Sequence, residues 1–368
     1  MNHMRRALEL ARQARGATSP NPPVGAVLVR DGEVVGEGHT QPPGQPHAEV
    51  MALRQASARA RGATLYVTLE PCSFRGRTPP CTRAIIEAGV AEVRLATVDP
   101  NPRVAGKGAA ELKAAGLRVR TATGRDRDAA RELMDAHAKY ITTGLPLVIA
   151  KYAMSLDGKI ATRDGDSRWV SGPQSRARAH ELRRVADAVA VGVTTVLRDD
   201  PRLTARNDRD EPYPRQPLRI VLDDYGRTPL TAKLLHEPGR AMLAVRSIDA
   251  QKRAALEKQG VEVVALPAHE GAVSLRALLM LLGQREVTSL LVEGGGTLLG
   301  SFMDAGLIDR VAAFVAPVLI GGAEAPSAVM GAGVQRMAEA TRLTRVRTER
   351  LGDDVLVTGY VRDPWTQR

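Results

Sequence analysis

The 368-residue sequence predicts an α/β protein with two domains. A chain of this length is too long for one ordinary hydrophobic core, and short apolar runs alternate with helix-like stretches in both halves. A helix-like stretch at 126–140 is followed by Thr142-Thr143-Gly144, and a new apolar run begins at Leu145. We therefore expect one domain at residues 1–144 and a second at residues 145–368.

The first half begins with a helix and a β-hairpin. Apolar residues recur with helical spacing over residues 4–15. The dipeptide Asp31-Gly32 favours a two-residue turn, so it should join a strand at 24–29 to a strand at 33–38. Beyond the hairpin we expect helices at 47–59, 82–88, 109–115 and 126–140, and strands at 64–69, 92–97 and 117–120.

The second half alternates in the same way with an unrelated sequence. We expect strands at 147–152, 188–191, 218–222, 241–245, 261–266, 289–292 and 311–314. Helices should lie between several of them, for instance at 175–184 and 250–258. Asp249 directly precedes the second of these helices and is a suitable N-cap.

Composition limits the classes of partner. The net charge of +11 favours anionic partners, but aromatic residues, which stack on bases, make up only 3% of the chain. The arginines are spread along the sequence, so phosphorylated metabolites are favoured over nucleic acid. No run approaches the ~18 apolar residues of a membrane span, and the N-terminus lacks the apolar region of a secretory signal. With only two cysteines, we expect a cytoplasmic protein without a disulfide scaffold or a membrane partner.

His47, Glu49, Cys72 and Cys81 are the residue types of a zinc deaminase. One imidazole and two thiolates suit Zn²⁺, and three protein ligands leave the fourth tetrahedral position to water. Glu49 follows His47 by two residues and is well placed to move protons. Eight residues separate the cysteines, whereas the common deaminase signature has two. Two other interpretations stay open at this point, namely a structural zinc site closed by a further ligand and two unrelated buried cysteines.

The segments around these residues resemble a known family. Thr-Leu-Glu-Pro-Cys-Ser at 68–73, Gly-Arg-Thr-Pro-Pro-Cys at 76–81, Asn-Pro-Pro-Val-Gly-Ala at 21–26 and the loop 99–108 look like the deaminase half of the bifunctional deaminase/reductase family of riboflavin biosynthesis. The eight-residue spacer is that family's own. The resemblance implies that His47, Cys72 and Cys81 bind zinc, that Glu49 protonates the pyrimidine ring and the leaving ammonia, and that Asn21 orients the ring.

Two positions depart from the family pattern. Many relatives carry histidine where this chain has Met51 and Phe74. Neither position is a zinc ligand or the general acid/base in the family. The departures therefore concern substrate contacts rather than the class of reaction.

A glycine-rich turn follows one expected strand of the second half. Glu293-Gly294-Gly295-Gly296-Thr297 comes directly after the strand 289–292, and N–H groups at a helix start can bind phosphate. The turn is not the G-x-G-x-x-G fingerprint of dinucleotide-binding folds. Taken alone, it is equally well explained as an ordinary connection between a strand and a helix.

The segments that surround this turn resemble the reductase half of the same family, which is similar in fold to dihydrofolate reductase. These segments are 155–161, 167–171, 192–196, 199–204, 292–295 and 317–322. The resemblance covers nearly the whole chain in family order. It implies an N-terminal cytidine-deaminase-like three-layer α/β domain and a C-terminal dihydrofolate-reductase-like α/β domain.

The resemblance also implies the residues of the reductase site. NADPH would be held by Ala153, Trp169, Thr195, Asp199, Gly295, Gly296, Thr297, Leu298, Leu299, Gly300 and Ser301. The substrate would be held by Ser167, Arg183, Leu203, Arg206 and Glu293.

The chemistry of these residues agrees with such roles. Arg183 and Arg206 could clamp a ribose 5-phosphate, since guanidinium matches phosphate geometry. Lys151 and Asp199 could polarise or protonate the reacting sugar. The alternatives are solvated arginines, surface charges at Lys151 and Asp199, and a core position for Trp169.

The expected function is therefore bifunctional. Zinc-dependent hydrolysis would deaminate 2,5-diamino-6-(5-phosphoribosylamino)pyrimidin-4-one, and NADPH-dependent reduction would convert the ribosyl group to ribityl. The expected binding partner is this phosphorylated pyrimidine, and no nucleic-acid partner is expected. The chain itself is expected to form a homo-oligomer. One alternative is a nucleic-acid base deaminase with an unrelated appended domain, which the scarcity of aromatics disfavours. Another is a degenerate zinc scaffold, which the presence of all four zinc-site residues disfavours.

Overall fold

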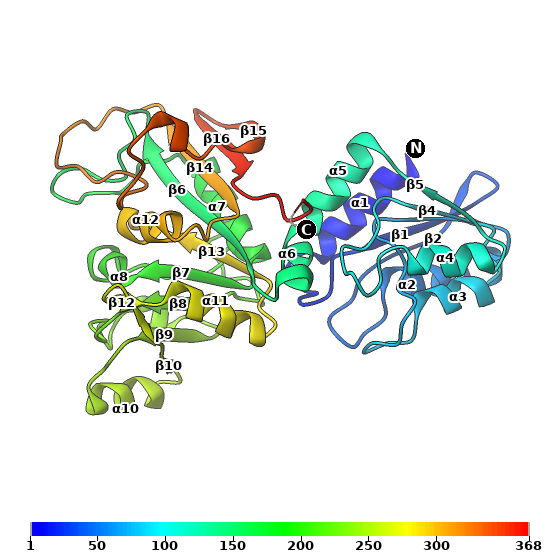
Figure 1. The fold of residues 1–368 in the computed structure, drawn as a ribbon, viewed down its shortest axis with the longest axis horizontal. Helices are drawn as coiled ribbons and strands as arrows, with labels where there is room; N and C mark the ends of the chain where they lie inside the picture. Colours follow the sequence, from blue (N-terminus) through cyan, green and yellow to red (C-terminus); the bar gives the residue numbers. More distant parts are fainter. Residues whose placement is uncertain (1, 367–368) are drawn as a thin grey trace. The chain divides into compact units, whose positions relative to one another are not determined.

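The computed structural model describes residues 2–366, which form two compact units that divide between Gly144 and Leu145 (Figure 1). Gly144 ends the last helix of the first unit, α6 (Asp135–Thr143), in a left-handed conformation with φ of 72°. Its N–H donates to the carbonyl of Tyr140, which closes the helix as a glycine C-cap does. Among the described residues, no helix combines the length and apolar character needed to cross a bilayer.

A five-stranded mixed sheet forms the centre of the first unit, in the order β2-β1-β3-β4-β5. Its strands are β1 (Gly25–Arg30), β2 (Glu33–His39), β3 (Thr64–Val67), β4 (Glu92–Leu95) and β5 (Arg118–Thr121). β1 runs antiparallel to both β2 and β3, whereas β3, β4 and β5 are parallel. The expected hairpin turn is confirmed, because Asp31 and Gly32 both have positive φ, 52° and 81°, as a type I′ turn requires.

Helices cover both faces of this sheet. They are α1 (His3–Ala14), α2 (Ala48–Ala56), η1 (Ser57–Ala60), α3 (Cys81–Glu87), α4 (Lys107–Ala114) and α5 (Gly124–Leu133). A Cβ on Gly25 would lie 2.0 Å from the carbonyl oxygen of Ala7 in α1, and one on Gly38 would lie 2.5 Å from that of Ala48 in α2. Gly38 pairs with Ala26, the neighbour of Gly25 in β1, so the two glycines lie on opposite faces. The unit therefore has three layers, with α1 and α5 on one face and α2, α3 and α4 on the other (Figure 1).

One expectation for this unit is wrong in detail. The single helix expected at 126–140 is two helices, α5 and α6, which meet at Met134. Met134 is fully buried and has φ of −110° and ψ of 11°, outside α-helical values. The core contact of this side chain fixes a bend that the local sequence does not reveal.

A nine-stranded sheet forms the centre of the second unit, in the order β10-β9-β8-β7-β13-β6-β14-β16-β15. The seven strands from β10 to β14 are parallel to their neighbours, and β16 and β15 continue the sheet in antiparallel fashion. Their bounds are β6 (Leu147–Ser155), β7 (Ala188–Gly192), β8 (Leu218–Leu222), β9 (Ala241–Val245), β10 (Glu262–Ala265), β13 (Ser289–Glu293), β14 (Arg310–Ala316), β15 (Thr344–Leu351) and β16 (Asp354–Tyr360).

Helices cover both faces of this sheet as well. The apolar side chains of α11 (Leu275–Gln284) and α12 (Gly296–Asp304) pack on one face. Those of α8 (Val193–Asp199), α9 (Lys233–His236) and α10 (Ala250–Lys258) pack on the other, together with Leu182 of α7 (Pro173–Val185). The expected N-cap of α10 is confirmed, because the side chain of Asp249 accepts from the N–H of Lys252. A small hairpin, β11 (Ala268–His269) and β12 (Ala272–Val273), and a short helix, η2 (Met337–Glu339), complete the unit.

Candidate active sites

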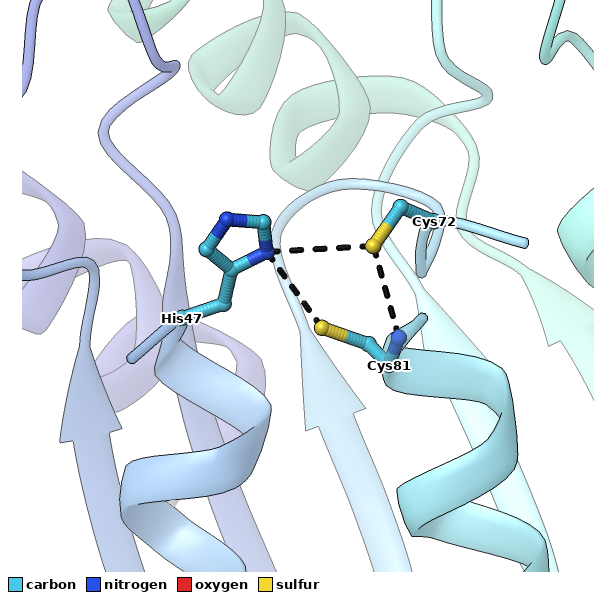
Figure 2. A group of neighbouring side chains, drawn as sticks. All are labelled: His47, Cys72 and Cys81. Carbon is cyan, nitrogen blue, oxygen red and sulfur yellow. Dashed lines mark hydrogen bonds between the residues drawn. The ribbon is translucent and has the colours of Figure 1, made fainter. Parts of the chain in front are cut away.

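Three side chains meet in the first unit. His47 directly precedes α2, Cys72 lies in the loop after β3, and Cys81 is the first residue of α3. The imidazole Nδ1 of His47 lies 3.8 Å from Sγ of Cys72 and 3.4 Å from Sγ of Cys81 (Figure 2). The backbone N–H of Cys81, at the start of α3, donates to Sγ of Cys72 over 3.4 Å. The start of α3 thus supplies one ligand and stabilises the thiolate of the other.

The spacing of the three ligand atoms fits zinc. With Zn–S of about 2.3 Å and Zn–N of about 2.0 Å, tetrahedral geometry requires an N-to-S separation of about 3.5 Å. All three ligand atoms lie within 4.8 Å of one another, and over residues 2–366 this group consists of His47, Cys72 and Cys81. The interpretation as two unrelated cysteines is therefore wrong. A set of three ligands is also what a catalytic site with an open fourth position needs.

The electrostatics of the site favour a cation between the sulfur atoms. The side-chain hydrogen bond between the two cysteines and the nearby His47 lower the pKa of Cys72 to about 5. The same hydrogen bond, with burial, raises the pKa of Cys81. The second thiol cannot ionise easily beside the first unless a cation compensates both charges.

Glu49 lies in the first turn of α2 and is only 4% exposed. Burial and the negative charge of Cys72 raise the pKa of Glu49 to about 7. A carboxyl group with such a pKa can both accept and donate a proton near neutral pH. Glu49 is therefore suited to moving protons beside the three ligands.

The other residues named for this site are placed as follows. Asn21 is half-buried in the segment between α1 and β1, and Met51 is half-buried in α2. Phe74 is 50% exposed in the loop that joins the two cysteine ligands. Their substrate contacts stay predictions.

Two residues with supporting roles were missed from the sequence. The hydroxyl of Thr78 lies 3.3 Å from Nε2 of His47, and such a partner fixes the orientation of a metal-binding imidazole. The buried carboxylate of Glu70 accepts from the backbone N–H groups of Asp99, Gly106 and Ala109 at 3.1, 2.9 and 2.9 Å. Both residues belong to segments that were recognised by resemblance, but their partners lie up to 39 residues away in the chain.

Gly108 gives a first prediction. A Cβ on Gly108 would lie 2.0 Å from the carbonyl oxygen of Pro71, the residue before Cys72. We expect Gly108→Ala to force α4 away from this loop, lowering the free energy of unfolding by about 1–3 kcal/mol and weakening zinc retention. Urea unfolding and zinc content after dialysis measure both effects. Gly76→Ala is the matched control, since its nearest neighbour would be an ordinary 3.5 Å away, and equal stability of the two variants would contradict the prediction.

A cavity of about 1930 Å³ opens in the second unit. It is bordered by β6, by the turns that follow β7 and β13, and by segments 160–171 and 199–206. Ligands of parallel α/β sheets bind at this carboxyl edge of the strands. The predicted residues that line it are Lys151, Ala153, Ser167, Trp169, Arg183, Thr195, Asp199, Leu203, Arg206, Gly295, Gly296, Thr297, Leu298, Leu299 and Ser301.

The glycine-rich turn forms one side of this cavity. Gly294 and Gly295 have φ of 76° and 69°, and a Cβ on either would crowd the side chain of Thr195. Gly295 is the N-cap of α12 and offers no side chain to cap it, which suits a phosphate ligand. At position 300 glycine is required by packing, because a Cβ there would lie 1.8 Å from the carbonyl oxygen of Met330.

Lys151, Arg183 and Glu293 form a charged cluster at the cavity. Lys151 and Glu293 are register partners in β6 and β13, with 3.6 Å between Nζ and the carboxylate. Arg183 from α7 donates to both carboxylate oxygens of Glu293, at 2.6 and 2.9 Å. Burial alone would raise the pKa of Glu293, but Arg183 and Lys151 lower it to about 2. Lys151 is therefore not a surface charge, and Arg183 is not a freely solvated arginine.

A second set of contacts orders the segment that carries Leu203 and Arg206. The carbonyl of Thr204 accepts from Nη1 of Arg183 at 3.2 Å and faces Nδ1 of His180 at 3.2 Å. Leu203 is buried with φ of 56°. Arg206, also buried, donates from Nε to the hydroxyl of Thr204 at 2.9 Å.

Segment 160–171 and the end of α8 carry further predicted residues of the cavity lining. Ser167 donates to the carboxylate of Asp199 over 3.4 Å, which joins a substrate candidate to a catalytic candidate. Trp169 is 70% exposed, and the guanidinium of Arg176 lies 4.7 Å from its ring centre. The alternative of a core tryptophan is therefore wrong.

Both halves of the chain match families of known proteins. A family described as cytidine and deoxycytidylate deaminase zinc-binding region matches residues 1–97, and the RibD C-terminal domain family matches residues 146–357. A riboflavin biosynthesis protein RibD from Aquifex aeolicus is 43% identical over 356 residues, covering 97% of each chain. That of Escherichia coli is 41% identical over 362 residues, covering 96% of this chain and 97% of the relative. The chain belongs to the RibD family.

Solved structures of this family agree with the fold. A RibD structure from Acinetobacter baumannii superposes with a TM-score of 0.85 at 39% identity and covers 97% of both chains. A structure from Thermotoga maritima, described as a diaminohydroxyphosphoribosylaminopyrimidine deaminase/5-amino-6-(5-phosphoribosylamino)uracil reductase, has a TM-score of 0.82 at 36% identity and also covers 97% of both.

Membership of the RibD family confirms several expectations. The fold class is confirmed as a cytidine-deaminase-like part followed by a dihydrofolate-reductase-like part. The chain is a bifunctional deaminase and reductase of riboflavin biosynthesis, with zinc in the deaminase and NADPH in the reductase. A nucleic-acid base deaminase with an unrelated appended domain is not supported, because the second half matches the reductase.

Proposed function

We propose that the first unit, residues 1–144, deaminates 2,5-diamino-6-(5-phosphoribosylamino)pyrimidin-4-one by hydrolysis. We propose that the second unit, residues 145–368, then reduces the ribosyl group of the product to ribityl with NADPH. The observation that carries the first step is the convergence of His47, Cys72 and Cys81 beside buried Glu49. The ion-pair cluster supports the second, because Lys151 and Arg183 line the large cavity and buried Glu293 pairs with both from behind the lining.

In the deaminase, His47, Cys72 and Cys81 would hold the zinc ion. When bound, zinc supplies a Lewis acid that lets water lose a proton near neutral pH. Glu49 would take that proton and deliver it to the ring nitrogen. It would then take the second proton of the attacking oxygen and pass it to the amino group, which leaves as ammonia as the carbonyl forms. Asn21 would orient the ring. Thr78 holds His47 in the rotamer that the ligand set needs.

In the reductase, NADPH would lie along the turn before α12, with Ala153, Trp169, Thr195 and Asp199 beside it. NADPH supplies the hydride for the sugar carbon. Lys151 would donate the accompanying proton, since burial lowers its pKa while Glu293 opposes this. Asp199, together with Ser167, would bind the sugar hydroxyls. Arg183 and Arg206 would bind the 5-phosphate, with Leu203 against the substrate and Glu293 as the partner that orients Arg183.

A coupled assay tests both steps with the purified chain. The diaminopyrimidine substrate should release one equivalent of ammonia, and NADPH absorbance should then fall by one equivalent. Zinc chelation should stop ammonia release and leave NADPH consumption on the deaminated substrate intact. NADPH consumption before deamination, or ammonia release that survives complete removal of zinc, would contradict the proposed order and site.

Arg183→Ala gives a second prediction. The substitution removes a predicted phosphate ligand and the partner of Glu293, so we expect the reductase KM to rise at least about tenfold. Deaminase kinetics should change far less. Arg184→Ala is the matched control, because Arg184 is adjacent in α7 and pairs with Glu181 instead. An equal loss of both activities in Arg183→Ala would indicate global damage and not a lost substrate contact.

Location in the cytoplasm and assembly as a homo-oligomer stay predictions. Both cysteines are free of disulfides, and their proposed role as zinc ligands requires reduced thiols, which supports the first. Size-exclusion chromatography with light scattering would measure the second.

A further inference from the structure

One carboxylate joins two arginines at the large cavity. Arg202 and Arg206 both line the cavity, four residues apart on the segment that follows α8. Glu237, just after α9, contacts them through separate oxygens: Oε1 lies 3.3 Å from Nε of Arg202, and Oε2 lies 2.9 Å from Nη2 of Arg206. A single negative charge therefore holds two guanidinium groups close together, although these groups would otherwise repel each other.

Glu237 is itself held by a buried arginine. Arg219 in β8 has no exposed surface. Its guanidinium donates to four backbone carbonyls, those of Leu234, Glu237, Pro238 and Gly239, at 2.6 to 3.2 Å. These bonds fix the segment that carries Glu237 to the central sheet. The carboxylate is thus placed by the core of the unit, not by a mobile loop.

The two arginines differ in how many protein partners they have. Arg206 is buried, and it uses Nε, Nη1 and Nη2 for Thr204, Asp210 and Glu237. Arg202 is half-exposed, and over residues 2–366 its ion pair with Glu237 is made through Nε. The two Nη groups of Arg202 are therefore the donors of this pair best able to meet an incoming anion. A phosphate dianion is the ligand that paired guanidiniums suit.

We propose that Arg202 is a further ligand of the substrate's 5-phosphate and that Glu237 is the positioning residue that keeps Arg202 and Arg206 together. The proposal rests on the proposed reductase function. The Nη groups of Arg202 would bind the phosphate in addition to Arg183 and Arg206, which line the same cavity. Glu237 would act through the arginines and would not touch the substrate.

The decisive experiment compares substrates with and without the phosphate. For Arg202→Ala we expect the KM for 5-amino-6-(5-phosphoribosylamino)uracil to rise about tenfold or more. The KM for the dephosphorylated substrate and the dissociation constant for NADPH should match those of the wild type. Arg209→Ala is the control: it removes one positive charge from the same region, at an exposed side chain outside the cavity lining, and should change neither constant.

Glu237→Gln tests the positioning role. It keeps the size of the side chain but loses the charge that pairs both arginines, so we expect a higher KM for the phosphorylated substrate with nearly unchanged kcat. In the double variant with Arg202→Ala, the change in binding free energy derived from KM should be smaller than the sum of the changes in the two single variants, because both substitutions act on one contact. NADPH binding by each variant verifies that the second unit is folded.

Three results would overturn the inference. The first is an equal rise in KM for both substrates in Arg202→Ala. The second is a loss confined to NADPH affinity, which would assign Arg202 to a cofactor phosphate. The third is a KM of Arg202→Ala for the phosphorylated substrate that equals the KM of an active wild-type enzyme. By contrast, a wild-type chain that fails to oxidise NADPH with either substrate would refute the proposed function itself.

Discussion

Replacing Cys72 by serine is expected to abolish ammonia release while NADPH oxidation on the deaminated substrate continues. A neutral hydroxyl is a poor ligand for zinc compared with a thiolate, and the site has three ligands to begin with. We expect deaminase kcat/KM to fall by at least roughly a thousandfold. Substituting a residue that only hydrogen-bonds to a metal ligand already lowers activity or metal affinity about 10- to 100-fold, and Cys72→Ser removes a ligand itself. Ammonia release and zinc content per chain are the two measurements.

The reductase activity and a second variant in the same loop serve as controls for Cys72→Ser. The reductase activity of the same preparation reports whether the second unit is intact. Gly76→Ala, in the same loop but without a ligand atom, should keep both zinc and activity. Deamination at the wild-type rate by zinc-free Cys72→Ser protein would refute the assignment of the metal site.

Glu49→Gln should leave zinc bound and still stop turnover. Glutamine has nearly the same shape as glutamate, but it cannot take a proton from water and return it to the substrate. General acid–base groups contribute about 10²- to 10⁴-fold, so we expect deaminase kcat to fall by about this factor. Steady-state kinetics and zinc analysis on the same sample separate proton transfer from metal binding.

Glu87→Gln is the matched control for this substitution. Glu87 lies at the end of α3 in the same unit and pairs with Arg83 on the surface. Glu87→Gln removes the same carboxylate group but at a surface position away from the three metal-ligand candidates, so the deaminase kcat of this variant should stay at the wild-type value. If Glu49→Gln lost zinc in proportion to activity, the carboxylate would be a supporting metal contact and not the proton carrier.

The sequence predicted those elements whose signal is local. Helix α10 occupies the expected residues 250–258, and the Asp31-Gly32 turn has the expected form. The zinc ligands were also correctly grouped, because their residue types and the surrounding segments are distinctive without any knowledge of distances. Such signals depend on helical periodicity, turn chemistry and motif spacing, which short stretches of chain carry by themselves.

Strand β15 shows where local signals end. β15 is an edge strand rich in Arg, Thr and Glu, and most of it is exposed, so it has no apolar alternation to detect. It is a strand because β16 supplies hydrogen bonds along one side. Edge strands are commonly charged in this way, which hides them from analysis based on hydrophobic pattern.

By itself, the sequence determined the alternating α/β elements, the grouping of His47, Cys72 and Cys81 as candidate zinc ligands, and the two classes of chemistry. The tertiary structure alone decided which polar groups meet: Arg183 with Glu293 across 110 residues, Glu70 with backbone N–H groups as far along the chain as Ala109 in α4, and Glu237 with Arg202 and Arg206. The reason is physical. Periodicity and capping act within a few residues, whereas these pairs depend on sheet register and on how helices pack across it.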